Sequence, residues 1–193
     1  MIKFKYTAVA LIPLSILFSS GVFAADENEE SNIPVLTVDG GTVHFTGSIV
    51  NAPCVVDVNS EGQTVRLGQY RTDSFKDVGS NSAPVDFTIN LINCSAETYK
   101  SASVKFTGST PEGTNDVLAL ASIQAGNKIA EGVGIQILQD NTPVTVDGSE
   151  GTAARTFNDG TNRLPFQARY LALNENIIPG EANASADFSI TYQ

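Results

Sequence analysis

The strongest constraint on the fold is a strict alternation of apolar and polar residues near each end of the chain. Within residues 39–49, one face of the pattern carries Val43, Phe45, Gly47 and Ile49. Within residues 187–192, one face carries Phe188, Ile190 and Tyr192. A period of two is typical of β-strands that bury one face. We therefore expect a strand at each place, and each strand needs a partner for its backbone.

Shorter stretches with the same period lie between these two. They are residues 64–67, 85–91, 104–106, 133–137 and 164–170. Turn signals such as Asp147-Gly148 and Asn158-Asp159-Gly160 separate some of them. Strands divided by such turns are typical of an antiparallel sandwich or barrel.

Two other segments are less distinctive. Residues 117–123 fit either a strand or one helical turn, and residues 68–84 form a long polar connection with little to bury. No long amphipathic helix follows the first 24 residues. The pattern predicts a single all-β domain without internal repeats.

The first 24 residues have the features of a secretory signal. Lys3 and Lys5 precede an apolar run over residues 8–18, and small residues precede a cut after Ala24. The alternative is an uncleaved anchor, but the run is short for a membrane span and Pro13 interrupts it. We expect an exported mature chain.

The mature chain is strongly acidic. Without residues 1–24 it has nine Lys and Arg against 21 Asp and Glu, a net charge of −12 with His44 neutral. Nucleic acids and anionic membranes need basic surfaces, so this charge disfavours both as partners.

The chain has two cysteines, Cys54 and Cys94, 40 residues apart. In an exported protein such a pair predicts one disulfide. A zinc site is a poor alternative, because zinc needs clustered Cys and His ligands and the chain has one histidine.

The search for catalytic chemistry finds no candidate site. His44 is the sole imidazole, and it lies within the alternating stretch 39–49, where a surface strand position is the simpler interpretation. A Ser-His-Asp arrangement needs a positioned base. We predict no enzyme activity, no cofactor and no metal site.

An ordered set of short motifs resembles the mature sequence of major type 1 fimbrial subunits, which are pilins of the bacterial chaperone–usher pathway. Near the start, the resemblance lies in Gly40-Gly41-Thr42-Val43-His44-Phe45, Gly47 and Val50-Asn51-Ala52 before Cys54. Further motifs are Leu67-Gly68-Gln69, Val117-Leu118-Ala119-Leu120, Val133-Gly134-Ile135-Gln136-Ile137 and Pro165-Phe166-Gln167-Ala168-Arg169-Tyr170. The likeness extends over nearly the whole mature chain.

The resemblance implies an incomplete immunoglobulin-like sandwich that lacks its last strand. In this family a neighbouring subunit or a periplasmic chaperone lends the missing strand to a hydrophobic groove. By position, the donor strand would carry Val43, Phe45, Gly47 and Ile49. The groove wall and the end recognised by the chaperone would carry Phe188, Ile190 and Tyr192. The family disulfide would join Cys54 and Cys94.

These implications divide the chain into a signal peptide (1–24), an N-terminal extension with the donor strand (25–49) and a pilin domain (50–193). The expected function is a structural subunit of a surface fimbria that supports cell adhesion. Its expected partners are copies of itself, a periplasmic chaperone and an outer-membrane usher. Alternatives are a minor tip or adaptor subunit, a secreted β-sandwich binding module, and a closed sandwich in which residues 39–49 are an ordinary first strand.

Overall fold

The computed structural model describes residues 34–122 and 126–193. The predicted signal peptide, residues 1–24, lies outside these residues. The chain divides into two units, residues 1–46 and 47–193. Residues 34–46 contain no strand or helix. Among the described residues, no helix is long and apolar enough to cross a membrane.

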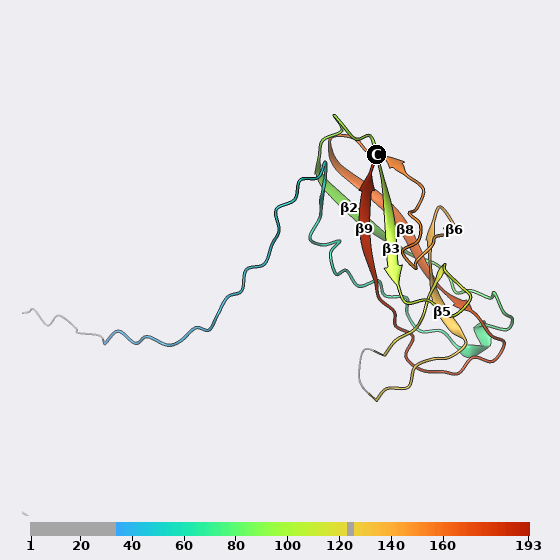
Figure 1. Cartoon of the computed structure of the whole chain (residues 1–193). Coiled ribbons are helices and arrows are strands. Elements are labelled where there is room, and N and C mark those ends of the chain that lie inside the picture. The colour runs from blue at the N-terminus through green and yellow to red at the C-terminus, as the bar shows by residue number, and fades with distance from the viewer. Residues whose placement is uncertain (1–33, 123–125) are drawn as a thin grey trace, which may run out of the picture. The chain divides into compact units, whose positions relative to one another are not determined.

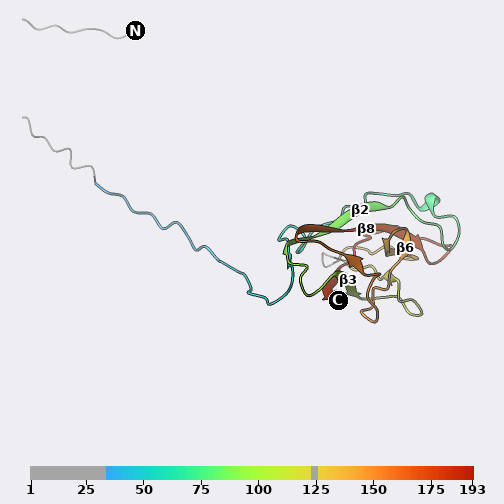
Figure 2. The ribbon, with the colours of Figure 1, turned by 90° about the horizontal axis from the view of Figure 1, so that it is seen from above.

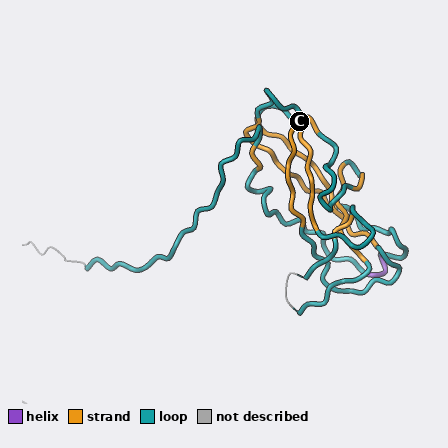
Figure 3. Tube along the Cα trace, in the orientation of Figure 1, coloured by secondary structure: helices purple, strands orange, loops and turns teal. Residues whose placement is uncertain are grey.

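The described residues of the second unit form strands and one 3-10 turn, η1 (Thr72–Ser74), as Figure 3 shows. The strands are β1 (Val55–Val56), β2 (Val85–Cys94), β3 (Ser101–Gly108), β4 (Val117–Leu118), β5 (Val133–Gln139), β6 (Thr142–Pro143), β7 (Arg155–Thr156), β8 (Gly160–Ala172) and β9 (Ala186–Tyr192). The all-β prediction is confirmed.

The strands form two antiparallel sheets. One has the order β1-β2-β8-β5-β4 with β6 beside β5, and the other has the order β7-β3-β9. Figure 1 shows β9 beside β3. Figure 2 shows β2 and β8 in one layer and β3 in the other. The arrangement is a two-layer sandwich, in which each sheet covers the apolar face of the other.

Aromatic side chains join the layers at the centre of the core. Phe166 on β8 stacks on its cross-strand partner Phe87, with ring centroids 5.6 Å apart. Phe106, from β3 in the other sheet, meets Phe166 edge-on at 5.2 Å. Phe106 and Phe166 are buried, and such pairs stabilise a core beyond their area alone. The alternation predicted for residues 104–106 and 164–170 therefore marks the inner faces of β3 and β8.

Strand β5 departs from the predicted alternation because both of its faces are covered. Gln136 is as buried as Ile135 and Ile137. Its amide donates to Asp116 (2.9 Å), and its oxygen accepts from Arg169 (2.8 Å). A buried amide needs such partners, so the polar position of the pattern is satisfied inside the sheet instead of in solvent.

Three local expectations are settled by the structure. No strand forms within residues 39–49, so the closed sandwich with an ordinary first strand is wrong. Residues 64–67 also form no strand, because no ladder partner lies beside them among the described residues. The ambiguous stretch 117–123 begins with a strand, since β4 pairs with β5.

The polar connection over residues 68–84 buries more than its composition indicates. Phe75, directly after η1, is only 7% exposed. Its ring lies edge-on to Tyr70 with centroids 6.3 Å apart. One aromatic residue therefore anchors this connection to the domain.

The predicted disulfide between Cys54 and Cys94 is present. It joins the residue before β1 to the last residue of β2, and both cysteines are buried. Beside it, the backbone N–H of Ser95 donates to the carbonyl of Pro53 (2.8 Å). The bond therefore holds the start of β1 against the end of β2, its partner strand.

Replacing both cysteines by serine should destabilise the domain. The disulfide closes a loop of 40 residues, for which chain entropy predicts a loss of about 4 kcal/mol in the free energy of unfolding. Guanidinium unfolding of the purified protein measures this change, with wild type reduced under denaturing conditions as the control. An unchanged unfolding midpoint would show that the disulfide contributes nothing to stability.

Candidate functional site

Strand β9 has a partner on one side only. It pairs with β3 and ends its sheet, and no other described strand lies against it. On β3, Gly108 is paired with Ala186 and Val104 is paired with Ile190. Both β3 residues bond on the side away from β9: the N–H of Gly108 donates to the carbonyl of Val146, and the carbonyl of Val104 accepts from the N–H of Thr152. In each residue pair of an antiparallel ladder, the backbone groups of the two residues point either toward each other or both away from each other. The free edge of β9 therefore presents the N–H and C=O groups of Ala186, Phe188, Ile190 and Tyr192.

A second unpaired segment, residues 62–68, lies across from this edge and lines the same cavity. Val65 and Leu67 are half-buried and pack against the core, while Thr64 and Arg66 are exposed. Its alternation is that of a strand, although it has no ladder. Positive φ angles at Gly62 (62°) and Gly68 (85°) bound the segment at both ends.

Between these two walls lies a cavity of about 890 Å³. Its floor includes apolar side chains from both sheets: Phe87, Ile89, Phe106, Ile137, Ala168 and Tyr170. Its walls are residues 62–68 and 182–188. Apolar surface open to solvent beside unpaired backbone is the combination that an added β-strand satisfies.

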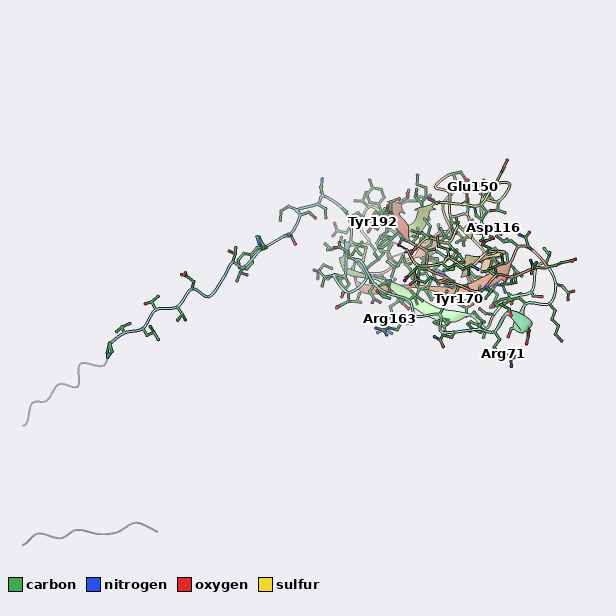
Figure 4. The ribbon with its side chains drawn as sticks, turned by 90° about the horizontal axis from the view of Figure 1, so that it is seen from below. Arg71, Asp116, Glu150, Arg163, Tyr170 and Tyr192 are labelled. Atoms are coloured by element: carbon green, nitrogen blue, oxygen red, sulfur yellow. A yellow bond between two sulfur atoms is a disulfide. The ribbon has the colours of Figure 1, made fainter. Side chains whose placement is uncertain are left out.

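A second cavity of about 610 Å³ is lined by some of the same residues. Tyr70, Phe75 and residues 177–183 line it, and Tyr170 lines both cavities. We call the two together the groove. Figure 4 shows Tyr170 and Tyr192 at separate places along the domain.

The predicted wall residues lie on the inner face of β9, and all three are half-buried. Phe188 lines the larger cavity, whereas Ile190 and Tyr192 pack against the core. Tyr192 lies edge-on to Phe157 (5.9 Å), and its hydroxyl donates to the carbonyl of Cys54 (3.4 Å). The structure thus brings the end of β9 to the disulfide. The recognition role of these residues stays a prediction.

The predicted donor residues are not buried within this chain. Val43, Phe45 and Ile49 are 73%, 90% and 102% exposed. Val35, Leu36 and Val38, earlier in the same segment, are also exposed. Exposed side chains on an alternating segment leave its apolar face without a partner.

For several groove residues, the sequence did not predict a place in the groove. Tyr70 and Phe75 lie in the polar connection, and residues 182–185 precede β9 without an apolar pattern. The isolated aromatic residues within this polar segment were the sequence feature that could have indicated burial beside the groove. The motif Ala182-Asn183-Ala184 belongs to the family resemblance, but small residues give no signal that they line a cavity.

Burial raises the pKa of two tyrosines, Tyr170 and Tyr192, above the ordinary value of 10.0. For Tyr170 the main cause is burial, and the charge of the neighbouring Tyr70 adds to it. For Tyr192 burial is the cause. Among the described residues, no three His, Cys, Asp or Glu side chains come together as metal ligands would.

The comparisons with known proteins agree with this geometry. The solved structure of the P pilus rod subunit PapA is similar over 74% of this chain and all of that one, with a TM-score of 0.62 and 28% identity. The type I fimbria protein of Burkholderia pseudomallei is 35% identical over 79% of this chain and 97% of its own, with a TM-score of 0.54. The fold is that of the chaperone–usher pilins, an immunoglobulin-like sandwich without its last strand.

The sequence matches are closer. The family model described as fimbrial protein matches residues 43–193. A type-1 fimbrial protein A chain of Escherichia coli is 43% identical over 98% of this chain and all of its own length. A type 1 fimbrial subunit of Klebsiella pneumoniae is 44% identical with the same coverage. The chain belongs to the fimbrial protein family.

The raised tyrosine pKa values predict a loss of stability in alkali. A folded-state pKa above the unfolded value favours folding fully below about pH 10, and this contribution is lost as the pH rises through the folded-state pKa. The variant Tyr170→Phe/Tyr192→Phe should lose less of its free energy of unfolding above pH 10 than wild type. Guanidinium unfolding at a series of pH values measures both slopes, and equal losses would contradict the assignment.

Proposed function

We propose that this protein is the repeating structural subunit of a bacterial surface fimbria, and that it polymerises by donor-strand exchange. The observation that carries the proposal is that one chain contains both a groove that lacks a strand and a strand-like segment that lacks a partner. The domain has an open groove beside the free edge of β9. The segment over residues 43–49 has a strand pattern and an apolar face without a partner.

The two parts match in length and in periodicity. Strand β9 has seven residues, and its free edge presents every second one. Residues 43–49 are also seven, with Val43, Phe45 and Ile49 at alternate positions on one face. A strand added to β9 would bond to this edge and direct alternate side chains onto the groove floor. On its other side, the added strand would lie beside the unpaired segment 62–68, which offers a second edge for backbone hydrogen bonds.

Burial supplies a large driving force for this exchange. Val43, Phe45 and Ile49 are at least 73% exposed in the free chain. Moving three such side chains into an apolar groove contributes about 5–8 kcal/mol from transfer alone. New ladder hydrogen bonds add to this, because the backbone groups of β9 otherwise lie beside apolar surface.

The same groove requires protection before assembly. A free sheet edge with exposed apolar surface pairs without control, so the proposal includes a periplasmic chaperone that lends a strand and an outer-membrane usher that orders assembly. The proposed layout is a cleaved signal over residues 1–24, an extension with the donor strand over 25–49 and a pilin domain over 50–193. The relatives are named as fimbrial subunits, which supports a structural role at the cell surface.

A charge on the donor face should abolish assembly. Phe45→Asp places a carboxylate where the proposal buries an aromatic ring, and burying an unpaired charge is strongly unfavourable. Thr46→Asp is the matched control, since its side chain lies on the opposite face of the segment. Counting fimbriae by electron microscopy should show few or none for Phe45→Asp and near wild-type numbers for Thr46→Asp.

Both residues are exposed in the free chain, so neither change should lower the amount of soluble subunit in the periplasm. Immunoblotting of periplasmic extracts checks this point. Equal numbers of fimbriae from both variants would contradict the donor role of residues 43–49.

A further inference from the structure

The extension carries a second apolar segment ahead of the donor strand. Residues 35–38 include Val35, Leu36 and Val38, and these three side chains are between 75% and 94% exposed. The residues before them, 25–32, are mostly acidic or polar and have nothing to bury. Exposed apolar side chains gathered in one short segment indicate a surface on which the segment binds. We call residues 35–38 the upstream segment.

The upstream segment does not simply lengthen the donor strand. Val35 and Leu36 are adjacent, so in a strand their side chains would point to opposite faces. Pro34, directly before them, has no N–H for a ladder. Gly41 has a φ of 95°, which interrupts an extended strand between this segment and residues 43–49. The upstream segment therefore needs a surface outside the groove.

The direction of the donor strand decides which surface this is. Every described strand pair in the two sheets is antiparallel. A donor that continues this pattern runs antiparallel to β9, with Val43 toward the end of β9 at Tyr192 and Ile49 toward its start. The upstream segment then leaves the groove past Tyr192. Val38 is five residues before Val43, a reach of at most about 18 Å.

An exposed aromatic side chain lies at this end of β9. Tyr99 comes directly before Lys100, whose backbone N–H donates to the carbonyl of Gln193 (2.7 Å). The ring centroids of Tyr99 and Tyr192 are 6.5 Å apart. Within the described part of the domain, the exposed aromatic side chains are Tyr99 and Tyr70, and Tyr70 lines the groove. Tyr99 is thus an exposed aromatic side chain outside the groove and within reach of the upstream segment.

We propose that the upstream segment of one chain packs on Tyr99 of the accepting subunit. This inference rests on the proposed strand exchange, and it adds a contact beyond the groove. An aromatic ring offers a broad apolar face, and aliphatic side chains that cover it leave water. Gly40 and Gly41 supply the bend between the two contacts. The extension therefore holds the accepting subunit at two places, the groove and Tyr99.

The second contact lies at the joint between consecutive subunits. The hydroxyl of Tyr192 donates to the carbonyl of Cys54 (3.4 Å), so the accepting subunit's own extension begins at this same end of its domain. A segment bound on Tyr99 braces the accepting subunit beside that point. Its loss should leave the groove contact intact, so fimbriae should still form but should come apart more readily.

The test measures how fast assembled fimbriae dissociate in guanidinium, followed by light scattering. Leu36→Ser and Tyr99→Ser each remove one side of the contact and leave residues 43–49 unchanged. Each variant should form near wild-type numbers of fimbriae that dissociate at least about fivefold faster, because the burial of one apolar side chain is lost. The double variant should dissociate no more than about twofold faster than Tyr99→Ser alone, since both changes remove the same contact.

The matched controls are Thr37→Ala and Val78→Ser. Thr37 is the polar residue of the upstream segment, and Val78 is an exposed apolar residue beside Gly79, which bonds to the last residue of β8. Tyr99 lies at the other end of that strand, where Ala96 bonds to Asp159. Both controls should dissociate at the wild-type rate. Wild-type rates for Leu36→Ser and Tyr99→Ser, or effects that add in the double variant, would overturn the proposal.

A cysteine pair tests the contact itself. Fimbriae of Leu36→Cys/Tyr99→Cys should give a ladder of linked chains after boiling without reductant. Leu36→Cys/Ser185→Cys should give none, because Ser185 is exposed and directly precedes β9, at the far end of the groove. Linkage through Ser185 instead, a link within one chain, or no link in assembled fimbriae would overturn the inference and leave strand exchange standing. Normal assembly of Phe45→Asp would instead show that the proposed function fails.

Discussion

The structure depends on the free edge of β9, whose backbone groups lack a partner strand. Strand β9 bonds to β3 on one side, and its other side presents backbone groups beside an apolar floor. Backbone N–H and C=O groups are costly to leave without partners near apolar surface. Phe188, Ile190 and Tyr192 all pack on the core and are half-buried, and Phe188 also lines the groove. A sandwich of this kind is complete only with a further strand.

The absence of this one strand accounts for two otherwise separate features. Residues 62–68 have a strand pattern without a ladder, because the strand that would lie between them and β9 is missing. Residues 43–49 have a strand pattern without a sheet. At the start of the domain, Cys54 is joined to the end of β2 by the disulfide and accepts a hydrogen bond from the hydroxyl of Tyr192 at the end of β9.

Much of the fold could be predicted because strand periodicity is a local property. Strands β2, β5, β8 and β9 lie where alternation predicted strands, and the presence of two cysteines in an exported chain predicted the disulfide. The groove could not be derived from periodicity, because its walls are segments far apart in sequence. The bond from Tyr170 to Ala182 and the burial of Phe75 also depend on tertiary contacts. The proposed donor role of residues 43–49 rests on a family resemblance, since the alternation alone favours an ordinary first strand of a closed sandwich.

The central claim is that residues 25–49 connect one subunit to the next. The most direct test compares the chain with and without these residues, each exported by its own signal, on SDS gels without boiling and by electron microscopy. The account predicts SDS-resistant ladders and rods from the full-length chain alone. Two well-behaved monomers of equal stability would contradict it, because the domain would then be complete without a donated strand.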